Sequence, residues 1–145
     1  MSKTATTALR PFHFAFHVLD LESTRRFYGD VLGCREGRST ETWVDFDFFG
    51  NQISCHTTGP VSATAPTGKV ENIQVPMPHF GAILGWHEFH ALADRIRGAG
   101  LLFIVEPRIR YEGQPGEQAT MFLLDPSGNA LEFKAFQHPE HVFTA

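Results

Sequence analysis

Hydrophobic and polar positions change their spacing along the chain, and each change marks an expected element. Residues 12–19 alternate aromatic side chains with histidines at the two-residue period of a β-strand. Residues 20–33 have the spacing of an amphipathic helix, which Gly33 is placed to end. Residues 58–74 are rich in Gly, Pro, Ser and Thr and are expected to form a linker or loop. Three short strands are expected between the helix and that loop, at 34–38, 42–49 and 52–57.

The second half of the chain has the same order of patterns. Residues 77–84 are expected to form a strand, and residues 86–97 an amphipathic helix that ends at Gly98 and Gly100. We therefore predict an α+β protein in which residues 1–145 form a single domain of two strand–helix–strand–strand–strand modules, at about 11–60 and 75–137. The last three strands are expected at 102–106, 119–124 and 130–136.

Two short matches indicate that the second module repeats the first. Asp47–Ser54 aligns with Asp125–Glu132 through a shared Gly-Asn pair, with an offset of 128 − 50 = 78. The segment HFAF at His13 aligns with HFGA at His79, with an offset of 79 − 13 = 66. The twelve additional residues between the two offsets are expected in a loop at Pro107–Glu117.

Composition narrows the range of partners. The formal charge is −4 and no basic cluster occurs, so we expect no nucleic acid and no membrane surface as partners. The first ten residues have no apolar core of a signal peptide, and no apolar run is long enough to span a membrane. Two lone cysteines do not make a disulfide framework. A cytoplasmic protein is therefore the expectation.

Three residues have the chemistry of a metal site with two histidines and one carboxylate. His13 and His79 begin the two modules at equivalent points, and Glu132 lies within the apolar segment LEFKAF. Such a ligand set leaves coordination positions open for substrate or oxygen, and pleated strands hold ligands rigidly. A single histidine on an aromatic strand is more often a core residue than a ligand. The repeat symmetry is what favours these three together.

These segments resemble a known superfamily. HFAFHVLDLESTRRFYGDVLGC resembles the opening of glyoxalase, bleomycin-resistance and extradiol-dioxygenase domains, and DPSGNALEF resembles their closing signature. The resemblance to this vicinal oxygen chelate superfamily covers nearly all of residues 12–136. It implies two βαβββ modules that form a cup-shaped, partly closed mixed sheet around one divalent metal ion. By position it implies His13, His79 and Glu132 as the metal ligands.

The residue equivalent to Glu132 in the first module is Ser54. Members of the superfamily with four protein ligands carry Glu, Gln or His there, and serine is a poor ligand for such cations. We therefore expect Ser54 to contact substrate without coordinating the metal, as in the open sites of extradiol dioxygenases and fosfomycin-modifying thiol transferases. His56 shares the face of Ser54, and is either a substitute ligand, an acid–base group or an ordinary histidine at a strand end.

Further candidates lie on the same face or on the inserted loop. His17 shares a face with His13, which makes it a candidate general base, but four strand residues span about 13 Å, too far for both to bind one ion. On the loop, Tyr111 is a candidate catalytic residue and Arg110 a candidate substrate contact. Four phenylalanines with even numbers are expected behind the sheet: Phe12, Phe14, Phe46 and Phe48.

The leading functional hypothesis is an extradiol, ring-cleaving dioxygenase that acts on a small vicinal diol or enediolate. Fe(II) is the favoured metal, with Mn(II), Zn(II) and Ni(II) as alternatives. A homodimer is expected, because paired modules expose strand edges that need covering. The alternatives are a glyoxalase-type lyase or isomerase, a thiol transferase, and a metal-free resistance protein that binds a drug. The complete ligand set counts against the last of these.

Overall fold

The computed structural model describes residues 9–61 and 64–144. Two modules of the same construction make up most of it, joined by a β-hairpin. The first module contains β1 (His13–His17), α1 (Leu21–Thr24), a π-helical continuation η1 (Arg25–Val31), β2 (Arg35–Ser39), β3 (Trp43–Phe48) and β4 (Asn51–His56). The hairpin consists of β5 (Ala65–Val70) and β6 (Ile73–Met77). The second module contains β7 (Phe80–Leu84), α2 (Trp86–Gly98), β8 (Val105–Arg110), β9 (Gln118–Leu124), β10 (Ala130–Phe136) and the short 3₁₀ helix η2 (Pro139–His141).

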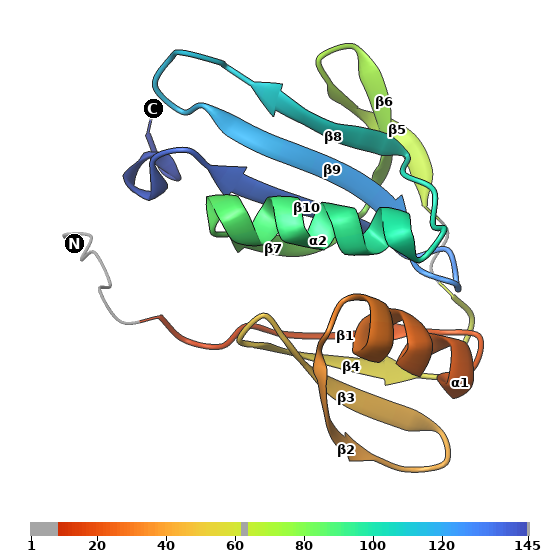
Figure 1. Ribbon diagram of the computed structural model, residues 1–145. Helices are drawn as coiled ribbons and strands as arrows, with labels where there is room; N and C mark the ends of the chain where they lie inside the picture. Colours follow the sequence, from red (N-terminus) through yellow and green to blue (C-terminus); the bar gives the residue numbers. More distant parts are fainter. Residues whose placement is uncertain (1–8, 62–63, 145) are drawn as a thin grey trace, which may run out of the picture.

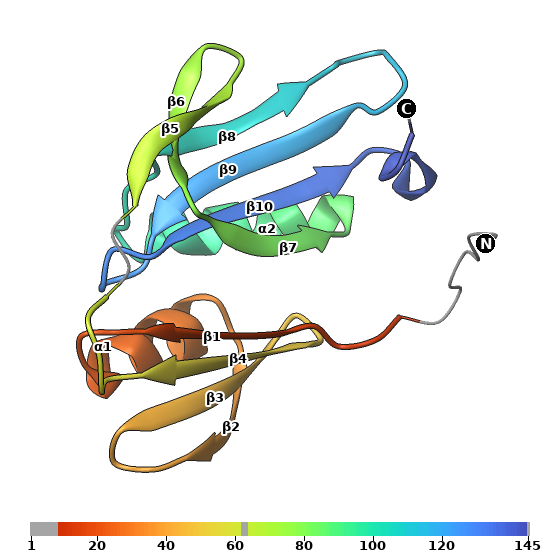
Figure 2. The same ribbon diagram turned by 180° about the vertical axis from the view of Figure 1, so that it is seen from behind.

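Each module forms a four-stranded mixed sheet, in the order β1-β4-β3-β2 and β7-β10-β9-β8. β1 pairs with β4 and β7 with β10 in parallel, whereas the remaining neighbours are antiparallel. β1 and β7 are the edges that face each other, and both helices cover the same side of the sheets (Figure 1). The opposite side is an open face without helices (Figure 2). The predicted pair of βαβββ modules in an α+β fold is confirmed.

The strand register agrees with the repeat seen in the sequence. His13 lies opposite Gln52 in the first module. Phe80 lies opposite Leu131, so the preceding residue, His79, stands beside Ala130, which is 78 residues after Gln52. Gly50 and Gly128 have matching positive φ angles of 88° and 87° in the turns before β4 and β10. Because glycine adopts this conformation without steric strain, the Gly-Asn pair marks the same turn in both modules.

The structure corrects three expectations from the sequence. The segment 58–74 is not a loop throughout, because β5 and the first two residues of β6 lie within it and join at a turn where Glu71 and Asn72 have positive φ. This hairpin is stable because its valines pack on the second sheet, a contact that local spacing cannot reveal. The predicted strand at 102–106 starts later, at Val105, and continues to Arg110, so the first four residues of the expected 107–117 loop belong to strand β8. Phe12 precedes β1 and is 68% exposed, whereas Phe46 and Phe48 are buried as expected.

Aromatic rings on the helix side of the sheets join the two modules. The ring of Phe80 lies 5.0 Å from that of Phe14 and 5.0 Å from that of Phe16. Phe48 of the first module lies 5.9 Å from Phe133 of the second. Such contacts combine apolar burial with favourable ring geometry. Aromatic side chains on the helix side of both sheets therefore hold the modules together, and the open faces take no part in this contact.

A buried polar contact fixes the same junction. The hydroxyl of Tyr28, which is 0% exposed, donates to Oδ2 of Asp125 at 2.8 Å. The carboxylate also accepts from the backbone of Ser127 and Asn129. Asn129 donates its side-chain amide to the carbonyl oxygen of His17 at 3.0 Å. The turn before β10 is thus bonded to a helix residue and to the end of β1.

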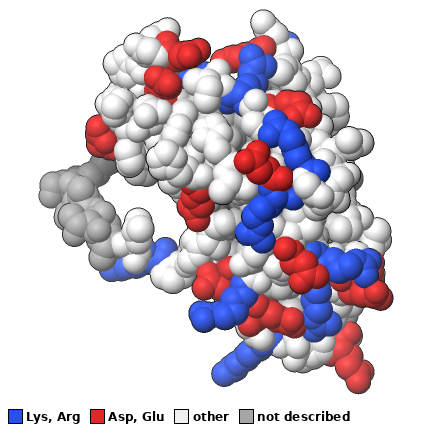
Figure 3. All heavy atoms as spheres, in the orientation of Figure 1, with Lys and Arg blue, Asp and Glu red and all other residues white. Residues whose placement is uncertain are grey.

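Charged side chains of both signs lie interspersed on the face drawn in Figure 3. No helix in the described residues is long and apolar enough to cross a membrane. These observations agree with the balanced composition of the chain.

Removal of the Tyr28 hydroxyl should loosen the junction between the modules. In Tyr28→Phe the Asp125 carboxylate loses one buried donor, so we expect the free energy of unfolding to fall by about 1.5–3 kcal/mol. Urea denaturation measures the change. The matched control is Tyr111→Phe, since Tyr111 is 48% exposed and should be close to neutral. Equal stability of Tyr28→Phe and wild type would contradict the role given to this contact.

The buried thiols should make the fold sensitive to alkaline pH. Burial raises the pKa of Cys34 from 9.0 to about 12 and raises that of Cys55 further still. Above pH 9 the unfolded chain loses these protons while the folded chain keeps them, so stability present below pH 9 is lost as pH rises. We expect the free energy of unfolding to fall by roughly 1.4 kcal/mol per pH unit for each thiol. Urea midpoints measured across this range test it. If the free energy of unfolding of the Cys34→Ala/Cys55→Ala protein falls with pH as steeply as that of wild type, other groups cause the loss of stability.

Candidate functional site

His79 and Glu132 lie side by side on the open face of the second module. His79 immediately precedes β7, and Glu132 lies in the middle of β10. His79 Nε2 is 3.2 Å from Glu132 Oε1, and the two side chains are 21% and 10% exposed. The other ring nitrogen, Nδ1, is 2.7 Å from the carbonyl oxygen of Pro76 in the hairpin. Because a carbonyl oxygen only accepts, Nδ1 must carry a proton and donate it.

This tautomer has a consequence for the gap between the two residues. In a neutral imidazole with the proton on Nδ1, the lone pair of Nε2 faces a carboxylate oxygen of Glu132. Two lone pairs at 3.2 Å repel each other unless a proton or a cation lies between them. Nitrogen and oxygen ligands of one ion, each at about 2.0–2.2 Å from it, stand about 3.0–3.4 Å apart. The pair therefore fits two adjacent ligands of one metal ion.

The surroundings hold this pair in place. Thr120 Oγ1, which is fully buried, donates to Glu132 Oε2 at 2.5 Å. The ring of Phe122 meets that of His79 edge-on at 4.9 Å. Gly81 lies opposite Glu132, and a Cβ atom there would stand 1.5 Å from the Glu132 carbonyl oxygen, so only glycine fits. Outer hydrogen bonds to a histidine and a carboxylate are typical of metal ligands, because they orient the coordinating atoms.

His13 lies in the other module and does not join this pair within the chain. Asn129, just before β10, contacts the end of β1 at His17, so the start of β7 lies near that end. His13 begins β1, four residues or about 13 Å further away. Its Nδ1 lies 2.8 Å from Gln52 Oε1. Among the described residues, no three His, Cys, Asp or Glu side chains gather in a group that could hold a metal.

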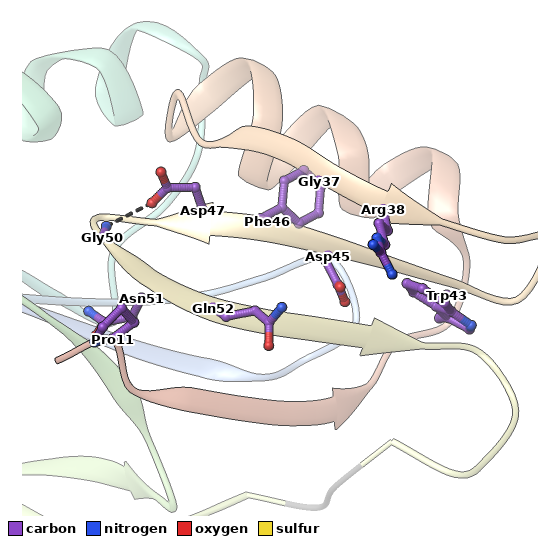
Figure 4. A pocket seen from close by; sticks show the side chains of 10 residues that line it. All are labelled: Pro11, Gly37, Arg38, Trp43, Asp45, Phe46, Asp47, Gly50, Asn51 and Gln52. Atoms are coloured by element: carbon purple, nitrogen blue, oxygen red, sulfur yellow. Dashed lines mark hydrogen bonds between the residues drawn. The ribbon is translucent and has the colours of Figure 1, made fainter.

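The open face of the first module presents three rows of side chains across β1, β4 and β3. Strand register defines the rows as His13–Gln52–Asp47, Ala15–Ser54–Asp45 and His17–His56–Trp43. A hollow of about 540 Å³ lies against this face (Figure 4). Trp43, Asp45 and Gln52 line it, together with Arg38 of β2. The hollow is wide enough for a small molecule and is lined by charged, amide and aromatic groups.

Ser54 stands where the second module has Glu132, and its contact reveals a residue that the sequence did not indicate. Ser54 Oγ donates to Asp45 Oδ1 at 2.6 Å. Asp45 lies across from Ser54 on β3, at the position that Phe122 occupies opposite Glu132. The first module thus also has a carboxylate on its open face, one strand away from the expected place. Knowledge of the cross-strand register would be needed to find it.

The remaining candidates lie at the margins of the two open faces. His17 and His56 are paired in register on the first module, and the His56 ring lies 6.0 Å from that of Trp43. Arg110 ends β8 on the second module and donates to the Tyr111 hydroxyl at 3.1 Å. Arg110 also pairs with Glu71 of the hairpin at 3.5 Å. The structure therefore places the histidines on the first module, and Arg110 and Tyr111 on the second.

Comparisons with known proteins agree with this architecture. Residues 10–133 match the family model described as the Glyoxalase/Bleomycin resistance protein/Dioxygenase superfamily. A glyoxalase/bleomycin resistance protein/dioxygenase from Alicyclobacillus acidocaldarius is 30% identical, with 92% of this chain and 96% of that chain covered and a TM-score of 0.75.

Two further solved structures share the fold at lower identity. A glyoxalase/dioxygenase from Nostoc punctiforme is 16% identical over 93% of this chain and 100% of that chain, with a TM-score of 0.65. A lactoylglutathione lyase from Agrobacterium tumefaciens is 16% identical over 98% of this chain and 100% of that chain, with a TM-score of 0.64. A search of curated proteins gave no match. The two modules, their register and the match over most of its length show that this chain belongs to the glyoxalase/bleomycin resistance protein/dioxygenase superfamily.

Proposed function

We propose that this protein is a metal-dependent enzyme that acts on a small molecule with two neighbouring oxygen atoms. The observation that carries the proposal is the 3.2 Å separation of His79 Nε2 and Glu132 Oε1. Both atoms present lone pairs to the same point, and their partners Pro76 and Thr120 fix them there. A divalent ion between them would satisfy both atoms.

His13 would complete the site from a second copy of the chain. Two protein ligands hold an exposed ion weakly, and the sequence repeat favours His13 as the third. Within one chain His13 lies at the other end of the junction between the modules, on an open face that no described helix covers. A homodimer in which the first module of one copy faces the second module of its partner would bring His13 to His79 and Glu132. Such a dimer would hold two identical sites.

The ligand set favours Fe(II), because two histidines and one carboxylate with open positions are typical of non-haem iron oxygenases. Mn(II), Zn(II) and Ni(II) remain chemically compatible with these ligands. When bound, the ion would polarise the two substrate oxygens and lower their pKa as a Lewis acid. The chain's own residues would position the substrate and move its protons.

Ring cleavage of a catechol by a dioxygenase is the first reaction that we propose. His17 and His56 stand in one row on the open face of the first module, beside Trp43, and supply imidazoles for proton transfer. Ser54 lies in the adjacent row, where it would form part of the substrate cavity. A flat aromatic diol would find Trp43 as a stacking surface in the 540 Å³ hollow.

A second candidate is a lyase or isomerase that moves a proton next to a carbonyl group. The observation that favours it is Asp45, a half-buried carboxylate held by the Ser54 hydroxyl on the face that would close over the metal. A carboxylate so placed is suited to accept a proton from carbon. The two candidates differ in their need for oxygen, which makes them separable.

The first functional prediction concerns metal binding. Wild type should retain one divalent ion per chain after dialysis, and Glu132→Ala should lose it. Thr120→Val, which removes only the donor to Glu132, should weaken binding about tenfold to a hundredfold. Isothermal titration measures both affinities. Glu36→Ala and Thr67→Val are matched controls on exposed strands and should bind as wild type.

The same measurement on a mixed dimer tests the contribution of His13. His13→Ala and Glu132→Ala chains with different tags are co-expressed, and the heterodimer is isolated. If each site combines both chains, one site per heterodimer is intact and half of the wild-type metal content returns. A site within one chain would leave both sites of the heterodimer defective. Full metal content in the His13→Ala homodimer would remove His13 from the ligand set.

The second functional prediction distinguishes the two reactions. Fe(II)-loaded protein should bind catechol without oxygen, with a spectral change, and oxygen uptake should follow on admission of air. Asp45→Asn should preserve this activity, whereas His17→Ala/His56→Ala should reduce it by at least roughly a hundredfold. Absence of catechol binding by fully loaded protein would exclude ring cleavage. Turnover of a carbonyl substrate in the absence of O₂ would favour the lyase or isomerase, provided that Asp45→Asn abolishes it.

A further inference from the structure

A second hollow lies on the open face of the second module, beyond the candidate metal ligands. Its volume is about 410 Å³, and it is bounded by the ends of β9 and β10 and by the C-terminal turn η2. Gln118, Lys134, Tyr111 and His141 line it. Lys134 also lines the hollow that contains His79 and Glu132, so the two spaces meet at its side chain. The proposed reaction gives no role to this region.

Gln118 has an unsatisfied acceptor at the base of this hollow. The residue is 8% exposed, and its Nε2 donates to the carbonyl oxygen of Gly116 at 3.2 Å. This bond assigns the orientation of the amide and leaves Oε1 facing away from Gly116. Oε1 is buried and has no hydrogen-bond partner within residues 9–61 and 64–144. A buried acceptor without a donor is costly, which points to a missing donor from a ligand.

The hollow also offers hydrogen-bond donors. Lys134 lies opposite Thr120 on β10, on the same face as Glu132, and it forms no ion pair with any described carboxylate. His141 Nδ1 accepts from the backbone N–H of Gly116 at 3.2 Å, which leaves the ring proton on Nε2. An ammonium group and an imidazole N–H thus line the same hollow as the residue with the unsatisfied amide oxygen. Together they match a carboxylate with a donor group beside it.

We propose that this hollow is a binding subsite for a small carboxylic acid that carries a hydroxyl or amino group on the adjacent carbon. The carboxylate binds the Lys134 ammonium, and the hydroxyl or amino group donates to Gln118 Oε1. Glu132 and Lys134 are two residues apart on one strand, about 7 Å between Cα atoms. Resting on the function proposed above, the inference assigns the substrate an acidic end on the far side of Lys134 from its metal-binding oxygens.

The test uses the metal-free full-length protein and glycolate, which carries a carboxylate and an adjacent hydroxyl. Titration followed by ¹H–¹⁵N NMR should give saturable shifts centred on the amides of Gln118, Lys134 and His141. Lys134→Met should weaken glycolate binding at least about tenfold, since it removes a charge-assisted hydrogen bond. Lys134→Arg should retain binding. Lys69→Met is the matched control, because Lys69 is exposed on β5 and should bind as wild type.

Acetate, which lacks the hydroxyl, isolates the contribution of Gln118. It should bind roughly threefold to tenfold more weakly than glycolate to wild type, and Gln118→Leu should reduce glycolate to the level of acetate. Absence of saturable shifts at these amides would overturn the subsite, as would equal affinity in Lys134→Met and wild type. Metal uptake by Lys134→Met is measured separately and should be normal. If wild type binds glycolate but takes up no metal, the proposed function is rejected and the subsite stands. If wild type takes up metal but does not bind glycolate, the subsite is rejected and the proposed function stands.

Discussion

The buried bond between Tyr28 and Asp125 controls how the two modules meet. A carboxylate inside a protein is tolerable only when donors surround it, and Asp125 finds them both in its own turn and in the opposite module. Burial raises the pKa of the Tyr28 phenol well above its ordinary value of 10.0, so the hydroxyl stays a donor. Separation of the modules would leave this carboxylate with fewer partners and expose the phenylalanines around Phe80.

The side chains that join the modules lie on the helix side of both sheets. The open faces therefore remain free to bind other molecules. Each open face has part of the proposed ligand set: His13, which is bonded to Gln52, lies on one module, and His79 and Glu132 lie on the other. The proposed second copy follows from this separation, because the two modules of one chain lie side by side with both open faces on the same side, so that one open face cannot fold onto the other (Figures 1 and 2). The hairpin β5–β6 reinforces the arrangement through Pro76, whose carbonyl orients His79.

Features that depend on local pattern could be predicted from the sequence. The modules, the turns at Gly50 and Gly128, and the equivalence of Ser54 with Glu132 all follow from spacing and short repeats. Three features could not be predicted because each depends on packing between distant segments. The hairpin is stabilised by valines against the second sheet, and the role of Asp45 requires knowledge of strand register. The separation of His13 from His79 depends on how the two sheets are arranged against each other. The positions of His13, His79 and Glu132 in the sequence do not reveal that arrangement.

At one equivalent position the two modules carry different residues, Ser54 in the first module and Glu132 in the second. This difference gives the two open faces different chemistry. One module has the carboxylate that we propose as a metal ligand, whereas its counterpart has a serine bonded to a neighbouring aspartate and a wide hollow. Substitutions at Arg38 and Trp43 would therefore change the lining of this hollow without touching Glu132 or Thr120. Under the proposed function, the molecule that the site accepts can therefore change in one module while the carboxylate ligand in the other module stays the same.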